Sequence, residues 1–263
     1  MAVIVLIVLL VKPSPHPAPV AAPPPSPPPV VTTPSPAVTP AIVSRSDLIA
    51  GAAVASSAYA AGEAQSIKAG PQAGRPFAID IAFGCTGPVT DPGSAQIYYQ
   101  YDPKKQALRL VARPSTWTDL PLIRAMSASK PTDTVKGFWL PRPWTASEAC
   151  PPPRDAPPPA TPTPIAAPTL GLAMVYGPES SRVDQRGDRP YEFLVKLSKP
   201  DAPILSRTFR LKIEGRIASF SDSAAVRCWS ESNEHRPVCI YAVDIDRVAF
   251  EDNQGAVLTE WLR

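Results

Sequence analysis

Two dense proline tracts limit where this chain can form a packed structure. Proline accounts for 37 of the 263 residues, and 24 of those prolines lie between Pro13 and Pro40 or between Pro141 and Pro168. Proline lacks a backbone N–H and fixes φ, so neither a helix interior nor a central strand tolerates this density. The tracts therefore divide the chain into an apolar leader, an extended spacer, and one domain that a proline-rich loop interrupts.

The leader, residues 1–12, is apolar from Ala2 to Val11 and ends in Lys12 and Pro13. Ten or eleven helical residues span about 16 Å, roughly half the hydrocarbon core of a bilayer. The segment has the length of a signal-peptide h-region but lacks a positively charged n-region. We favour a start upstream that completes a membrane anchor. The alternative is that Met1 is correct and the segment is a marginal anchor.

The spacer, residues 13–43, consists mainly of Pro, Ser, Thr, Ala and Val. This composition favours extended polyproline II, which rises about 3.1 Å per residue. We therefore expect a semi-rigid spacer that holds the following domain away from its anchor.

The remaining residues, 44–263, are predicted to form a single β-rich domain interrupted by the proline-rich loop at 151–168. From Ser44 onward, 25 Lys and Arg residues face 23 Asp and Glu residues, with no basic run. This near balance argues against a nucleic-acid partner and against a polybasic membrane patch. Membrane contact is expected through the N-terminal segment only.

Hydrophobic periodicity predicts one helix followed by short strands. Residues 44–61 read as a helix, because Ser44 or Ser46 can cap it and Leu48, Ala52, Ala55 and Tyr59 share one stripe. Period-two alternation and turn residues indicate the strands. The predicted strands cover residues 77–83, 97–101, 108–110, 170–176, 191–197, 208–214, 224–229, 238–245 and a last segment through Trp261. We expect a mainly β fold, an antiparallel β-sandwich or partly open barrel, with one N-terminal Ala-rich helix.

The four cysteines indicate two disulfides rather than a metal site. None of Cys85, Cys150, Cys228 and Cys239 forms a C-x-x-C pair, and the sequence contains only two histidines. Cys228 and Cys239 flank residues 233–234 symmetrically, so they face each other in a hairpin, and Cys85 pairs with Cys150 by elimination. Two disulfides behind an apolar leader predict an oxidising compartment.

The segment 137–144, GFWLPRPW, contains one phenylalanine and two of the five tryptophans of the chain. Trp139, Arg142 and Trp144 could form a stacking platform for a sugar or a proline-rich peptide. The alternative, which we favour, is that both tryptophans are core plugs that close the open end of a sandwich.

No residue pattern predicts a catalytic, cofactor or metal site. Asp244 and Asp246 lie on one strand face, but polar alternation on an exposed strand explains them. His235 lies in a Glu-His-Arg-Pro turn, and no motif such as G-x-S-x-G supplies a nucleophile.

These features predict a non-enzymatic envelope protein. The domain would reside in the periplasm, anchored to the inner membrane or exported, and would bind a protein or a cell-wall glycan. The alternative is a secreted hydrolase with an unrecognised site. A deep polar cleft containing clustered carboxylates or His235 would favour that alternative.

Overall fold

The computed structural model describes residues 41–63, 73–93, 95–127, 134–152, 168–176, 189–197, 208–220 and 222–263. Residues 39–263 form one compact unit, and the other unit, residues 1–38, lies outside the described residues. The leader, nearly all of the spacer and most of the 151–168 loop therefore remain sequence predictions.

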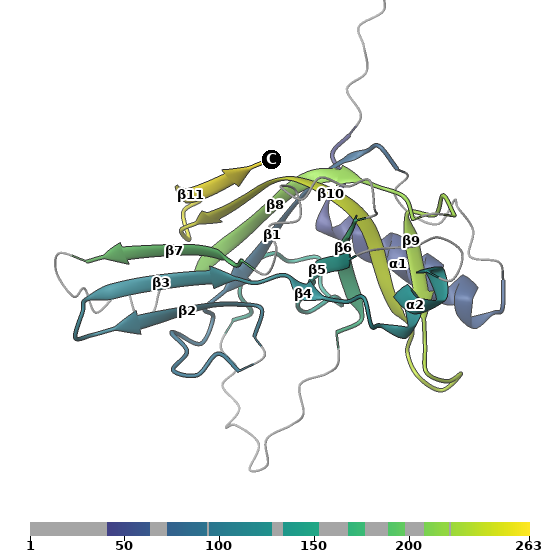
Figure 1. Cartoon of the computed structure of the whole chain (residues 1–263), viewed down its shortest axis with the longest axis horizontal. Helices are drawn as coiled ribbons and strands as arrows, with labels where there is room; N and C mark the ends of the chain where they lie inside the picture. The colour runs from purple at the N-terminus through teal and green to yellow at the C-terminus, as the bar shows by residue number, and fades with distance from the viewer. Residues whose placement is uncertain are drawn as a thin grey trace, which may run out of the picture. The chain divides into compact units, whose positions relative to one another are not determined.

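The described residues form two β-sheets and two helices (Figure 1). The helices are α1 (Arg45–Ala60) and α2 (Pro121–Ser127). The strands are β1 (Pro76–Phe83), β2 (Ile97–Asp102), β3 (Ala107–Ala112), β4 (Ser115–Thr116), β5 (Thr134–Trp139), β6 (Leu170–Tyr176), β7 (Tyr191–Lys196), β8 (Phe209–Ile217), β9 (Val226–Trp229), β10 (Val238–Glu251) and β11 (Val257–Leu262). The mainly β fold with an N-terminal helix is confirmed. The sequence prediction missed α2, β4 and β5.

The larger sheet has the order β1-β8-β10-β6-β5-β4, and β9 and β11 also pair with β10. The smaller sheet has the order β2-β3-β7. The pairings between these strands are antiparallel except that of β6 with β10, which is parallel. The chain between β6 and β10 contains three further strands, so it is long enough for the crossover that parallel pairing needs.

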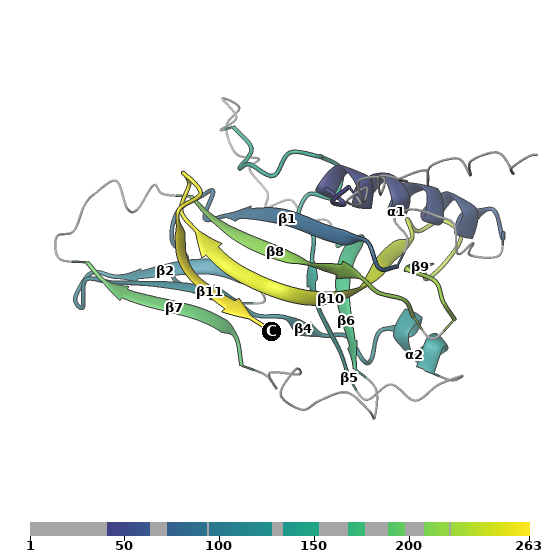
Figure 2. The same ribbon diagram turned by 90° about the horizontal axis from the view of Figure 1, so that it is seen from above.

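Strand β10 connects the two halves of the larger sheet (Figure 2). Its first residues pair with β6 and β9, and its last residues pair with β8 and β11. The register with β8 shifts between Ile245 and Arg247, so Asp246 is the extra residue of a β-bulge. A bulge bends and twists its strand, which allows one strand to belong to both halves.

The main core contains the apolar residues of β1 that the period-two alternation predicted to be buried. Phe77, Ile79, Ile81 and Phe83 are buried on one face of β1, and they pack in one cluster with residues of both sheets. A second, smaller cluster includes Trp117, Ile123, Val135, Ala173, Phe220 and Ile240. Both faces of the β5–β6–β10 region are therefore buried.

Helix α1 packs on β9 and β10 through small side chains. Ser44 and Asp47 form a capping box at its N-terminus. Ala52 and Ala55 are buried, and the Tyr241 hydroxyl donates to the Leu48 carbonyl at 3.0 Å. Burial raises the pKa of Tyr241, so the hydroxyl stays protonated and keeps donating at physiological pH. The predicted helix is therefore confirmed, and its alanine side chains lie on the buried face.

Candidate functional site: a groove at the free edge of β1

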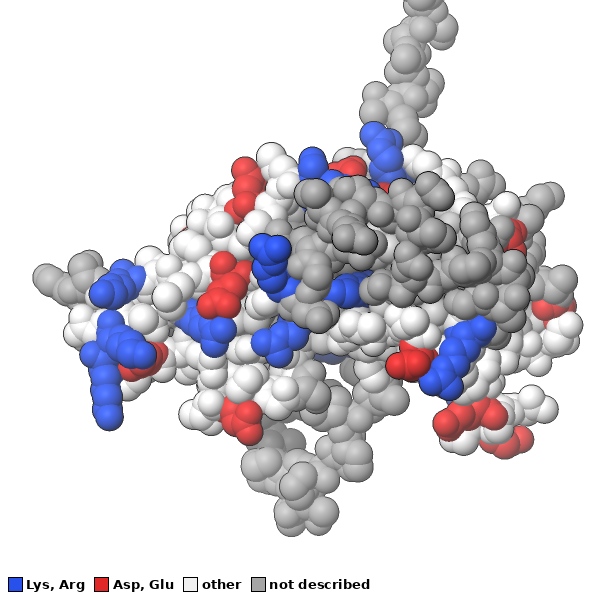
Figure 3. Space-filling view, viewed as in Figure 1, with Lys and Arg blue, Asp and Glu red and all other residues white. Residues whose placement is uncertain are grey.

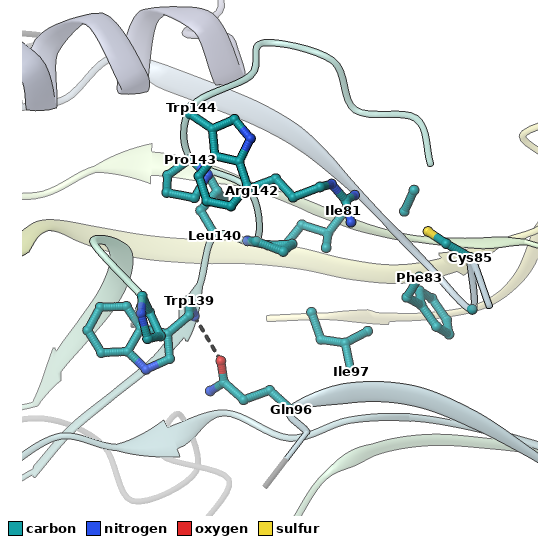
Figure 4. A pocket seen from close by; sticks show the side chains of 14 residues that line it. Ile81, Phe83, Cys85, Gln96, Ile97, Trp139, Leu140, Arg142, Pro143 and Trp144 are labelled. Carbon is teal, nitrogen blue, oxygen red and sulfur yellow. Dashed lines mark hydrogen bonds between the residues drawn. The ribbon is translucent and has the colours of Figure 1, made fainter. Parts of the chain in front are cut away.

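A groove of about 490 Å³ lies between the end of the edge strand β1 and the segment that follows β5 (Figure 4). Residues 81–85 line one side of it, and residues 139–144 line the other. The remaining lining residues are Gln96, Ile97 and Pro168. Within the described ranges, strand β1 pairs with β8 and, at one isolated bridge, with Val43, so the groove lies where the larger sheet ends.

Residues 139–150 are here called the strap; residues 139–144 of it line the groove, and the strap is fixed at both ends. The Leu140 N–H donates to the Leu170 carbonyl at 2.8 Å. At the other end, Cys150 forms a disulfide with Cys85. Between them, the Glu148 carboxylate accepts a hydrogen bond from the Asp80 N–H at 3.0 Å. The strap is therefore held against β1 by side-chain and covalent contacts rather than by a β-ladder.

Arg45, the first residue of α1, fixes the middle of the strap. Its side chain is 2% exposed, and its guanidinium donates to the carbonyl oxygens of Pro141, Arg142 and Thr145. Burial lowers the pKa of Arg45, and the nearby positive charge of Arg142 lowers it further, while Glu148 opposes both effects. Because one planar group satisfies three carbonyls, the conformation of this turn depends on Arg45.

Replacing Arg45 with alanine is expected to lower the free energy of unfolding by about 3 kcal/mol, because three carbonyls lose their charged donor. Arg45→Lys keeps the charge but not the forked geometry, so we expect an intermediate loss. Urea denaturation of both variants measures the change. Equal stability of Arg45→Ala and the native protein would mean that the strap is held without this contact.

The structure separates the two tryptophans of the predicted surface. Trp144 is 65% exposed, so the core-plug interpretation is wrong for this residue. Trp144 lies in a turn at residues 142–145, in which Arg142 has a φ of 52°, in the left-handed region, and which Arg45 holds. The indole of Trp144 thus stands at the mouth of the groove (Figure 4).

Trp139 has a different environment. Its ring centroid lies 4.3 Å from that of Trp117, and it packs against the second core cluster. Its indole points away from the groove in Figure 4. Its backbone N–H donates a hydrogen bond to Gln96 Oε1 at 2.9 Å. Trp139 is half-buried, so packing describes it better than ligand contact.

Among the residues that the structure describes, Arg142 is the only charged one that lines the groove. Its side chain extends from the strap toward β1 in Figure 4. Burial lowers the pKa of Arg142. Its Nε is buried without a hydrogen-bond partner, and no described residue forms an ion pair with its guanidinium. A partly desolvated cation without an anion is the strongest chemical signal in this groove.

Gln96 also lines the groove, and the sequence analysis did not identify it. Its Nε2 donates to Ser115 Oγ at 2.7 Å and to the Gly137 carbonyl at 3.0 Å. Its Oε1 is occupied by the Trp139 N–H. Gln96 is therefore a structural link between β5 and the segment before β2, and no sequence motif marks such a residue.

Both disulfides predicted from the sequence are present. Cys85 joins Cys150, and Cys228 joins Cys239 across β9 and β10. In that hairpin Val226 lies opposite Tyr241, as the predicted register requires. The two disulfides indicate an oxidising, extracytoplasmic environment.

The other candidate residues lie outside this groove. His235 is on an exposed turn, where its Nδ1 lies 2.8 Å from Ser232 Oγ. Asp244 lies 3.7 Å from Arg263 Nη1, as expected of a surface carboxylate. Within the described part of the chain, no three His, Cys, Asp or Glu residues are grouped as metal ligands would be.

The surface charge is mixed. On the face in Figure 3, acidic and basic side chains of the described residues are interspersed rather than separated by sign. Of the helices that the structure describes, neither α1 nor α2 combines the length and hydrophobicity that crossing a bilayer requires.

Comparisons with known proteins give no relative of this chain. No family model matches it, and no curated protein or solved structure shows significant similarity.

Proposed function

We propose that this chain is a non-enzymatic, envelope-associated protein whose disulfide-linked β domain binds a protein or a cell-wall glycan. In this proposal the domain resides in the periplasm, and the N-terminal segment anchors it to the inner membrane or directs its export. The proline spacer would place the domain at a distance from the membrane. The observation that carries the proposal is Trp144, a large aromatic side chain held 65% exposed beside an apolar groove.

Several properties of the groove favour binding. An apolar hollow with a few polar groups at its rim is the usual form of a ligand site. Tryptophan and arginine are the residues that most often carry binding energy at interfaces. Trp144 and Arg142 stand on a strap whose turn Arg45 holds in place, so their arrangement exists before a ligand arrives.

The same groove offers little to a hydrolase. Its lining contains no Ser, Thr, His, Asp or Glu among the described residues, and its one cysteine, Cys85, is in a disulfide. A hydrolytic site needs an activated nucleophile or water with a base in hydrogen-bond reach. The secreted-hydrolase alternative thus gains no support from this groove.

Replacing Trp144 with alanine tests the proposal. We expect the free energy of unfolding to change by less than about 1 kcal/mol, because the side chain is mostly exposed. Binding should be lost, because an exposed aromatic anchor commonly contributes 2 kcal/mol or more. Retention on purified peptidoglycan sacculi and site-specific crosslinking in intact cells are the measurements.

Trp139→Ala is the matched control. Its indole packs against that of Trp117, so we expect this change to lower the free energy of unfolding by about 2 kcal/mol. Its effect on binding should be smaller than that of Trp144→Ala. Unchanged retention and crosslinking in a stable Trp144→Ala protein would contradict the proposed function.

A further inference from the structure

The free edge of β1 carries a second signal beside the groove. The Ala78 N–H donates to the Val43 carbonyl at 3.1 Å, and the Asp80 N–H donates to Glu148 Oε1 at 3.0 Å. These two groups point away from β8. Since alternate residues of a strand present their backbone groups to the same edge, the N–H and C=O of Ala82 also point away from β8.

Ala82 differs from these neighbours because its backbone N–H and C=O have no partner among the described residues. It lines the groove and is 6% exposed. Leaving a backbone polar group without a partner away from water costs about 1–3 kcal/mol. An incoming strand supplies both missing partners at once. Gly84, with a φ of 73°, ends the extended conformation, so the open edge is short.

We propose that the groove binds an extended, acidic peptide segment of a partner protein, which pairs with Ala82 on the free edge of β1. A carboxylate of that segment forms an ion pair with Arg142, and a proline or aromatic ring of the segment packs on Trp144. This inference rests on the proposed function and selects a protein rather than a glycan as the partner.

The choice of a peptide follows from the polar groups that remain available. A glycan presents hydroxyls along its length and needs many polar partners. In this groove the amide nitrogen and oxygen of Gln96 are already hydrogen-bonded within the protein. Ile81, Phe83 and Leu140 have apolar side chains and can form no hydrogen bond with a sugar hydroxyl. The backbone of Ala82 matches the donor and acceptor of a peptide residue.

The choice of an acidic segment follows from Arg142. A carboxylate satisfies a guanidinium with two parallel hydrogen bonds, and burial of the pair strengthens them relative to water. Trp144 lies two residues away on the same turn, so one short segment can contact both side chains (Figure 4).

The test uses the full chain and an array of synthetic six-residue peptides. In each peptide valine and threonine alternate, and one glutamate and one proline occupy varied positions. A matched array replaces glutamate with glutamine. Fluorescence anisotropy measures binding, and purified peptidoglycan sacculi serve as the glycan probe.

We expect glutamate peptides to bind at least tenfold more tightly than their glutamine counterparts, and Arg142→Gln to remove this difference. Arg216→Gln, at an exposed arginine of β8, should leave it unchanged. N-methylation of the peptide nitrogen that pairs with Ala82 should weaken binding at least tenfold, and this change leaves the protein itself intact.

The outcomes separate the inference from the proposed function. Retention on sacculi through Trp144 without peptide binding would overturn the peptide inference and keep the binding function. Peptide binding that is unchanged by both N-methylation of the peptide and Arg142→Gln would also overturn the peptide inference. If the native protein bound no peptide, no sacculi and no cellular partner, both the peptide inference and the proposed function would be overturned.

Discussion

Replacing Gly215 with alanine is expected to lower the free energy of unfolding by at least about 3 kcal/mol, the range of severe overpacking. A Cβ atom at this position would overlap the Asp244 carbonyl oxygen and would lie 2.9 Å from Ile245 Cα. Both contacts are with backbone of β10, which cannot rotate away as a side chain can. Gly215 lies opposite the bulge at Asp246, so the close approach of β8 and β10 requires glycine here.

Chemical denaturation of Gly215→Ala beside Arg216→Ala measures this effect. Arg216 is the neighbouring residue and is exposed, so its replacement should change stability by less than about 0.5 kcal/mol. A Gly215→Ala protein as stable as Arg216→Ala would mean that the bulge relaxes without breaking the pairing of β8 and β10.

Replacing both Cys85 and Cys150 with alanine should lower the free energy of unfolding by about 4 kcal/mol, because the disulfide closes a loop with a sequence separation of 65. The Cys228–Cys239 disulfide closes a loop with a sequence separation of only 11, so replacing both of its cysteines should lower the free energy of unfolding by about 3 kcal/mol. Only the first disulfide holds the strap, so only its removal should also weaken binding in the groove.

Thermal or urea unfolding of the two double variants gives the stabilities, and retention on the partner gives the binding. Mass spectrometry after alkylation without reductant should find no free thiol in the native protein. Equal loss of binding in both variants would indicate a general effect of instability rather than a role for the strap.

Much of the fold follows from local patterns in the sequence. The alternation of residues 77–83 predicted a strand with one buried face, because side chains of a strand alternate between two faces. The spacing of Cys228 and Cys239 about a turn predicted both the hairpin and its register. A cap at Ser44 or Ser46 and the stripe of Leu48, Ala52, Ala55 and Tyr59 predicted α1, and the structure shows that Ser44 is the cap.

The position of Trp144 and the form of the groove depend on contacts that are distant in sequence. Trp139 and Trp144 belong to one aromatic stretch, yet Trp139 packs against Trp117 and Trp144 is exposed. Arg45, nearly 100 residues away, holds the turn that separates them. Periodicity cannot show such a contact, because it records only which face of an element is apolar.

The sequence by itself determined the strands other than β4 and β5, the N-terminal helix and the cysteine pairs, since each depends on residues close together or on a simple choice of partners. Only the tertiary structure decided that β6 lies parallel to β10, that β5 is buried on both faces, and that the end of β1 lines one groove with Arg142 and Trp144. These features depend on how distant segments pack, and the free energy of that packing is not encoded in any one segment.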